Sequence, residues 1–249
     1  MLKKVTPGTT SRLTIVDHAE TYGRHLLRRF VRRLAVSDCV DLGCGAGDDL
    51  AIVREAHPGA RCTGVDFGLW NRERLLERGI APVSVDIERE PLPLADGSLD
   101  LVIMNQVLEH TKEVFWINHE VFRALRVGGH AWLGVPNVLS LHNRLLGLFG
   151  VHPTQAKMVS GHVRVFSRAD TLLFYREVAG GFAAVREFAG SQFYPFPRAI
   201  ARPLAAVLPS CAFSIFFLIE KTARYGGEFL AWLDGARLET NFFRGAQGP

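Results

Sequence analysis

Three glycines at alternate positions, Gly43, Gly45 and Gly47, follow a short apolar run and precede Asp48-Asp49. Glycine permits positive φ angles and lets a ligand approach the backbone closely. A strand that leads through such a loop into a helix presents N–H groups at the carboxyl edge of a parallel sheet, where open α/β sheets bind ligands. The spacing differs from the G-x-G-x-x-G dinucleotide fingerprint, and two carboxylates would repel a pyrophosphate. The loop therefore favours a ligand without phosphate.

Two further carboxylates close the next apolar runs. Asp66 ends the run at 61–67, 23 residues after Gly43, and Asp86 lies at the end of the run at 81–87. A carboxylate at the first position can accept hydrogen bonds from both ribose hydroxyls of a nucleoside, and one at the second from an adenine amino group. An acid at a strand end is often only a helix cap. Three successive strand ends with such signals favour a nucleoside site.

The elements that would position these residues alternate regularly between residues 38 and 136, which predicts a parallel sheet with helices on both faces. The predicted strands are 39–42, 61–67, 81–87, 99–105 and 130–136, and the predicted helices are 10–36, 48–57, 69–78 and 113–126. Beyond Pro136 we predict helices at 138–149 and 168–179, a loop at 151–166, and strands at 181–190 and 212–222 that pair antiparallel at the sheet edge.

Residues 40–136 resemble a class I S-adenosylmethionine-dependent methyltransferase of the small-molecule type found in the quinone-biosynthesis (methyltransferase-11) group. The resemblance rests on five ordered motifs: "VDLGCGAG", "GVDF", "SVDIE", "LPLADGSLDLVIMNQVLEHT" and "EVFRALRVGGHAWLGVPN". It implies a Rossmann-like, three-layer α/β sandwich with a seven-stranded, mostly parallel sheet whose last strand is antiparallel. The predicted organisation is an N-terminal helical segment (1–36), a methyltransferase domain (37–222) with an acceptor-side insert or lid (137–180), and a C-terminal tail (223–249).

The resemblance also implies S-adenosylmethionine as cofactor and a set of residues that bind it. In that reading Asp41 and the three glycines contact its methionine part, Asp66 holds the ribose, Phe67 packs on the adenine, Asp86 and Ile87 bind the adenine amine, and Asn105 and Gln106 lie beside the sulfonium. The segment after Asp66, "FGLWNRERLL", lacks the serine that follows the acid in many relatives.

Catalysis of methyl transfer mainly requires that the nucleophile be positioned and water excluded. His110, after the fourth strand, is either a general base or a hydrogen-bonded structural residue. His162 and Arg164 in "GHVRVFS" would share one face of an extended segment, which predicts contact with the acceptor; a structured loop with solvated polar residues is the alternative. No metal site is predicted, because no Cys/His spacing matches a zinc module.

The composition narrows the class of protein. The net charge of +4 comes without long basic blocks, so no nucleic-acid partner is expected. Arginines cluster at 24–33, where a helix would face acidic lipid, a phosphorylated partner or simply solvent. Four cysteines without a CxxC pair and no apolar run after the N-terminus indicate reduced thiols in the cytoplasm and no signal peptide.

The apolar insert at 137–153 would lie on a membrane surface, line an acceptor pocket, or pack against the sheet or a dimer partner. We therefore predict methyl transfer from S-adenosylmethionine to an oxygen, or to a nitrogen or carbon, of a small molecule or a saccharide or lipid-linked precursor. The alternatives are methylation of protein or nucleic acid, disfavoured by "NQVLEH" where an "NPPY"-type segment would stand, and a non-catalytic cofactor-binding scaffold. The oligomeric state is left open.

Overall fold

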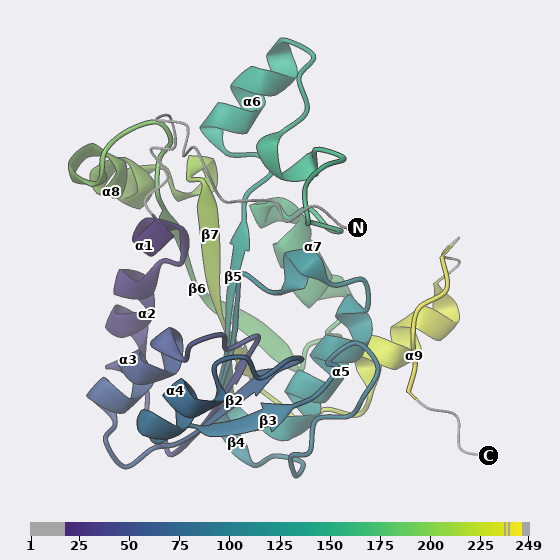
Figure 1. The fold of residues 1–249 in the computed structure, drawn as a ribbon. Helices are drawn as coiled ribbons and strands as arrows, with labels where there is room; N and C mark the ends of the chain where they lie inside the picture. Colours follow the sequence, from purple (N-terminus) through teal and green to yellow (C-terminus); the bar gives the residue numbers. More distant parts are fainter. Residues whose placement is uncertain (1–17, 237, 239, 246–249) are drawn as a thin grey trace, which may run out of the picture.

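The computed structural model describes residues 18–236, 238 and 240–245, and is built on one seven-stranded sheet (Figure 1). Its order is β3-β2-β1-β4-β5-β7-β6. The strands are β1 (Asp38–Leu42), β2 (Arg61–Asp66), β3 (Ala81–Ser84), β4 (Leu99–Asn105), β5 (Leu125–Pro136), β6 (Ala183–Ser191) and β7 (Ser214–Lys221). The first five are parallel, and β7 runs antiparallel between β5 and β6. The predicted fold class and the antiparallel pairing of the two late strands are confirmed.

Helices cover both faces of this sheet (Figure 1). They are α1 (His18–Thr21), α2 (Arg24–Val31), α3 (Asp48–Ala56), α4 (Arg72–Glu77), α5 (Val114–Ala124), α6 (Leu141–Leu148), α7 (Arg168–Glu177), α8 (Arg198–Val207) and α9 (Glu228–Gly235), with 3-10 turns η1 (Leu108–His110), η2 (Thr154–Ala156) and η3 (Pro209–Cys211). In Figure 1, α1 to α4 lie on one side, α5, α7 and α9 on the other, and α6 projects from the body. Within the described residues, no helix is both long and apolar enough to span a bilayer.

The strands divide the interior into two apolar clusters, one on each face. In β4, Leu101 and Ile103 pack in the cluster formed with α2 and α3, whereas Val102 and Met104 pack in the cluster formed with α5. All four side chains are fully buried. Successive side chains of a strand point to opposite faces, so a strand covered on both sides needs a continuous apolar run. The run "LVIM" therefore fixes β4 at the centre of the sheet.

The predicted N-terminal helix is interrupted. Its described part forms α1 and α2, separated at Tyr22-Gly23, while residues 10–17 lie outside the described residues. Gly23 has φ +54°, and a Cβ placed there would lie 2.3 Å from Cζ of the buried Phe216 ring. The left-handed turn lets the chain pass close to β7, and it places Tyr22 and Arg24 beside the glycine loop.

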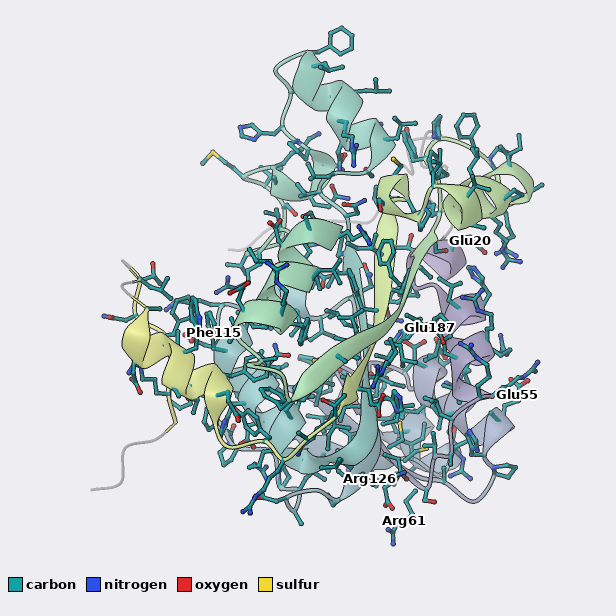
Figure 2. All side chains as sticks on the ribbon, turned by 180° about the vertical axis from the view of Figure 1, so that it is seen from behind. Glu20, Glu55, Arg61, Phe115, Arg126 and Glu187 are labelled. Atoms are coloured by element: carbon teal, nitrogen blue, oxygen red, sulfur yellow. The ribbon has the colours of Figure 1, made fainter. Side chains whose placement is uncertain are left out.

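Arginines in α2 and in the two residues after it pair with acids of the same chain. Arg28 and Arg32 contact Glu55 of α3, and Arg33 contacts Glu187 of β6, whose positions Figure 2 labels. These pairs are exposed and contribute little to stability. They favour the interpretation that this helix face is solvated, over an acidic lipid or a phosphorylated partner.

Two late helices, α8 and α9, were not predicted, and α9 lies within the expected tail at 223–249. Phe229 and Leu233 of α9 are buried in the core, and Trp232 stacks on Phe115 of α5 at a centroid distance of 5.3 Å (Figure 2). Phe243 N–H donates to Glu113 Oε2 at 2.7 Å. The described part of this segment therefore covers α5. The acidic and glycine residues around this apolar stretch had masked its helical period.

The boundary between α5 and β5 also differs from the prediction, which placed it near Gly128. The helix ends at Ala124 and the strand begins at Leu125. Lys221 of β7 is buried, and its Nζ donates to the carbonyls of Phe122 and Leu125, both at 2.6 Å. A cation at the carboxyl end of a helix stabilises its last carbonyl groups. Such a long-range cap is invisible in the local sequence.

Substitution Gly23→Ala is expected to lower the free energy of unfolding by about 2–4 kcal/mol, because a Cβ adds left-handed strain and overlaps Phe216. Gly147→Ala, in α6 with no atom within 4 Å of the added Cβ, serves as control and should be neutral or slightly stabilising. Urea unfolding of both variants measures the difference. Equal effects would show that the turn at Gly23 does not need glycine.

Candidate cofactor and acceptor site

The glycine loop is tied to β2 by its own backbone. The N–H groups of Gly43 and Cys44 donate to the carbonyl of Val65 at 2.8 and 3.1 Å. Gly43, Gly45 and Gly47 all have positive φ, at 67°, 51° and 75°. The alternate glycines are thus required by a backbone that side-chain-bearing residues rarely adopt.

The three glycines differ in what surrounds them. A Cβ on Gly43 would lie 2.6 Å from Val107, and one on Gly47 would lie 2.7 Å from Leu75 and Ile80. A Cβ on Gly45 would meet nothing within 4 Å. Gly43 and Gly47 therefore allow close packing of the protein, whereas the middle of the loop at Gly45 faces open space that a ligand can occupy.

Asp66 is the last residue of β2, as predicted, and it reaches the loop. Its Oδ2 accepts a hydrogen bond from the Gly45 N–H at 3.1 Å. Phe67 follows with 70% of its surface exposed, and Trp70 is 81% exposed. Phe67 was predicted as a cofactor-binding residue and Trp70 was not, although the run "FGLW" contains both aromatic residues. Asp66 thus contacts the glycine loop and is followed by two exposed aromatic residues. This arrangement suits a ligand with hydroxyl groups and a flat base.

A buried acidic network lies beneath the loop. Asp41 and Asp49 are 3% and 5% exposed. Arg24 Nε donates to Asp49 Oδ1 at 2.8 Å, and Asn105 Nδ2 donates to Asp49 Oδ2 at 2.6 Å. From the sequence, Arg24 was predicted only to lie on a basic helix face. Its partner Asp49 directly follows the glycine motif, and this opposite charge was the signal that could have placed Arg24 near the loop.

Burial raises the pKa of both acids. Burial, followed by the nearby Asp49 charge, raises the pKa of Asp41 well above its ordinary value. Burial also raises the pKa of Asp49, although the hydrogen bonds from Arg24 and Asn105 act in the opposite direction. Arg24 forms ion pairs with Asp49 at 2.8 Å and with Asp48 at 3.4 Å. A ligand that brings a further positive group to this edge would gain electrostatic stabilisation from these acids.

Asn105 and Gln106 stand at the end of β4. The Asn105 amide donates to Asp49 and to the Tyr22 carbonyl at 2.9 Å, so its N–H groups serve the protein, and contact with a cofactor stays a prediction. Gln106 has φ +59°, and its buried Nε2 has no hydrogen-bond partner within the described residues. A non-glycine residue held at positive φ stores strain of the kind that gathers at functional sites.

Asp86 and Ile87 lie just beyond β3, near the same edge. Asp66 pairs in register with Ser84, two residues before Asp86. The Asp86 Oδ1 accepts from Glu88 N–H at 3.0 Å, which forms a local turn, and Ile87 packs against the cluster that contains α5. The structure therefore places both residues next to the strand that carries Asp66, while their contacts with adenine stay a prediction.

A second group of polar residues forms where η1 meets the segment 161–167. The rings of His110 and His162 lie 4.8 Å apart, edge to face. His110 Nδ1 pairs with the Gly161 carbonyl at 3.1 Å. Glu109 is 1% exposed, and burial raises its pKa to about 8. Burial, and then the charge of His110, lowers the pKa of His162. The structure thus joins two of the predicted acceptor-side residues.

Arg164 does not join this group through its side chain. Its guanidinium donates to the Lys112 carbonyl at 2.6 and 3.1 Å and lies over the Phe242 ring. The segment is not a strand; the N–H groups of Val163 and Arg164 bind the Glu109 carbonyl at 2.7 and 3.1 Å. The predicted shared face required an extended segment, which the structure does not show, and backbone docking on η1 turns the two side chains toward different partners. Contact of His162 and Arg164 with the acceptor stays a prediction.

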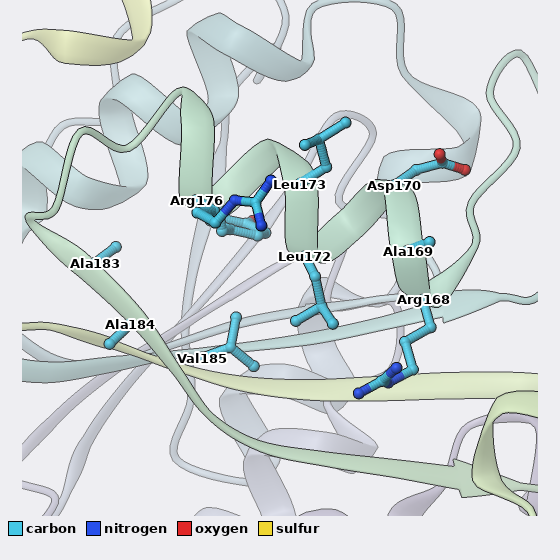
Figure 3. Close-up of a pocket in the computed structure, with 10 residues that line it drawn as sticks. Arg168, Ala169, Asp170, Leu172, Leu173, Arg176, Ala183, Ala184 and Val185 are labelled. Atoms are coloured by element: carbon cyan, nitrogen blue, oxygen red, sulfur yellow. The ribbon is translucent and has the colours of Figure 1, made fainter.

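A large open groove of about 700 Å³ lies elsewhere, between α7 and β6 (Figure 3). Arg168, Leu172, Arg176 and Val185 line it, and it includes no predicted site residue. A smaller cavity of about 160 Å³, next to η1, is lined by Leu108, Arg164 and Phe174 among others. The chemistry-bearing residues thus gather at the strand ends, away from the larger groove.

Comparisons with known proteins agree with this arrangement. Residues 40–133 match the family model described as a methyltransferase domain. The ubiquinone/menaquinone biosynthesis C-methyltransferase UbiE of Desulfotalea psychrophila is 27% identical over 51% of this chain and 55% of its own length. The malonyl-(acyl-carrier protein) O-methyltransferase of Laribacter hongkongensis is 29% identical over 54% of this chain and 52% of its own. The chain spans about half or less of the length of the curated relatives it matches.

A solved structure shows the same fold. The 1,6-didemethyltoxoflavin-N1-methyltransferase of Burkholderia thailandensis, with 1,6-didemethyltoxoflavin and S-adenosylhomocysteine bound, aligns with a TM-score of 0.56. The alignment covers 83% of this chain and 80% of that one at 15% identity. Together with the strand order, this structure shows that the chain has the class I S-adenosylmethionine-dependent methyltransferase fold, and residues 40–133 match the model of the methyltransferase domain family.

Proposed function

We propose that this chain transfers a methyl group from S-adenosylmethionine to an oxygen of a small molecule or of a saccharide or lipid-linked precursor. The observation that carries the cofactor half is the contact between Asp66 and Gly45 beside open space. There the loop backbone would hold the methionine part, Asp66 the ribose, and Phe67 and Asp86 the adenine. When bound, the cofactor supplies a methyl group already activated by its sulfonium.

The acidic network supports a cofactor with positive groups. S-adenosylmethionine carries an ammonium and a sulfonium, and Asp41 and Asp49 offer two buried carboxylates with Arg24 as one partner cation. The buried, unpartnered amide of Gln106 adds a donor at the end of β4. These groups are preorganised by the fold, so they need little rearrangement to bind the cofactor.

The acceptor half rests on His110. Its Nδ1 pairs with the Gly161 carbonyl, which leaves Nε2 able to accept a proton, and its side chain is half exposed. A neutral imidazole in this position can take the proton of an acceptor hydroxyl as the oxygen attacks the methyl carbon. Curated relatives include C- and O-methyltransferases, and the oxygen preference follows from this base.

The projecting helix α6 and the residues that follow it, up to residue 159, favour an apolar acceptor or an apolar surface. Leu145, Leu148 and Phe149 are 50%, 80% and 81% exposed, and Met158 and Val159 nearby are almost fully exposed. Packing of this helix against the sheet, one of the four sequence-based alternatives, is therefore wrong for these exposed side chains. A lipid-linked acceptor, a membrane surface or a second subunit would each cover them.

Radiolabelled S-adenosylmethionine, incubated with the protein and an extract of its host, tests the proposal. Label in an organic-extractable or glycan fraction would support a lipid-linked or saccharide acceptor, and label in water-soluble metabolites a small-molecule acceptor. Label in protein or nucleic acid, or none above a control without the protein, would contradict the proposal.

Asp66→Asn is expected to weaken S-adenosylhomocysteine binding about 10- to 100-fold, because the ribose loses hydrogen bonds to a charged acceptor. Isothermal titration measures the affinity. Asp234→Asn, an exposed position of α9 paired with Arg244, is the matched control and should bind as the wild type does. Unaltered affinity in Asp66→Asn would refute the ribose assignment.

S-adenosylmethionine affinity is expected to fall on acidification, because Asp41 has a raised pKa and becomes neutral at a higher pH than an exposed aspartate. A bound cation favours the ionised carboxylate, so each pH unit below that pKa costs at most about tenfold in affinity. Titrations across pH compare the wild type with Asp41→Asn, which should bind more weakly and with a flatter profile. Parallel profiles would show that Asp41 does not face the cofactor.

A further inference from the structure

The residues around η1 form a donor set of the kind that metal ions use. Glu109 and His110 are consecutive in η1, and His162 comes from the segment that docks on it. One potential ligand atom from each residue lies within 4.8 Å of the other two. Two imidazoles and one carboxylate match the ligands of zinc and related first-row cations, which often keep a further position open.

We propose that Glu109, His110 and His162 bind a divalent transition-metal cation, with zinc the best match, and that the open coordination position receives the acceptor oxygen. The binding site stands on these three residues alone. Its use for the acceptor rests on the proposed methyl transfer. No linear motif predicted it, because the third ligand is 52 residues from the second.

Two buried polar atoms at this site lack a close hydrogen bond among the described residues. Glu109 is 1% exposed, and its Oε2 makes no hydrogen bond with the described residues. The Nδ1 of His162 is likewise buried and makes no close hydrogen bond with the described residues, although the ring interacts with the Gln155 backbone. A buried polar atom without a partner costs about 1–3 kcal/mol. A cation held by this cluster would give such atoms a partner.

The orientation of His110 fits the same interpretation. Its Nδ1 pairs with the Gly161 carbonyl at 3.1 Å, and its Nε2 lies 4.0 Å from Glu109 Oε1. Metal-bound histidines usually donate the other ring N–H to such a carbonyl, which holds the ring and its tautomer. Ligands of one zinc ion lie about 3.3 Å apart, so a small rotation of the half-exposed His110 would close the site.

The backbone around the cluster is already held in place. Glu109 uses its carbonyl to bind the N–H groups of Val163 and Arg164, at 2.7 and 3.1 Å. His162 is therefore anchored to η1 by its own neighbours, and a metal would need to order only side chains. With a cation bound, His110 would be a ligand and no longer the general base, and the cation would take over that role. An acceptor hydroxyl would ionise more readily at the cation and release its proton to solvent, and its oxygen would take the methyl group as the carbon–sulfur bond breaks.

Metal binding by the full-length protein, purified without a polyhistidine tag and treated with chelator, tests the proposal. Zn²⁺ is titrated by calorimetry, and Co²⁺ by its visible absorption, which reports the coordination geometry. The wild type should bind one equivalent of each ion. Glu109→Gln, His110→Ala and His162→Ala should each weaken binding at least tenfold, and His152→Ala, an exposed histidine of the same insert, should leave it unchanged.

S-adenosylhomocysteine binding by the same samples separates the two proposals. Each ligand variant should keep wild-type affinity for it, which shows that the fold is intact. If Glu109→Gln loses that affinity, its fold is disturbed, and the metal affinities of His110→Ala and His162→Ala then decide whether the metal site exists. A wild type that binds S-adenosylhomocysteine but neither metal, or a metal affinity that survives all the variants, would overturn the metal site and leave the methyltransferase proposal standing. Metal binding without S-adenosylhomocysteine binding would do the reverse.

Discussion

The buried carboxylate of Asp49 holds the functional edge together. It accepts hydrogen bonds from Arg24 at the start of α2 and from Asn105 at the end of β4, while it stands itself in the first turn of α3. One side chain thus joins the N-terminal helix, the helix after the glycine loop and the central strand. Burying this charge beside Asp41 is costly, and the single guanidinium offsets only part of the cost. A cationic ligand at this edge, as in the proposed function, would offset more of that cost.

The sequence predicted the elements whose signals are local. The run "LVIM" predicts a strand buried on both faces, and the glycines together with Asp66 predict a cofactor site at the carboxyl edge of the sheet. Both patterns lie within short stretches of the chain. The parallel order then follows from the short crossovers. The break at Gly23 was missed because the need for glycine comes from Phe216, almost two hundred residues away.

The remaining differences also have long-range causes. The end of α5 depends on Lys221 of β7, which donates to the Phe122 carbonyl, and α9 packs on α5 through the ring of Phe115. Arg164 departs from its predicted face because Glu109 captures the backbone of its segment. In each case a partner distant in sequence overrides the local pattern. Acceptor-side residues depend most on such contacts, so the sequence predicted the local arrangement around the glycine loop better than the arrangement around η1.

The end of β4 couples the two halves of the site. Asn105 faces the acidic network of the cofactor edge, and four residues later Glu109 faces His110 and the docked segment. Between them, Gln106 is held at positive φ by its N–H bond to the Gly134 carbonyl. A strained residue therefore stands between the two clusters. In the proposed methyl transfer, this short stretch of backbone would set the distance between donor and acceptor, which suits a reaction whose main demand is alignment.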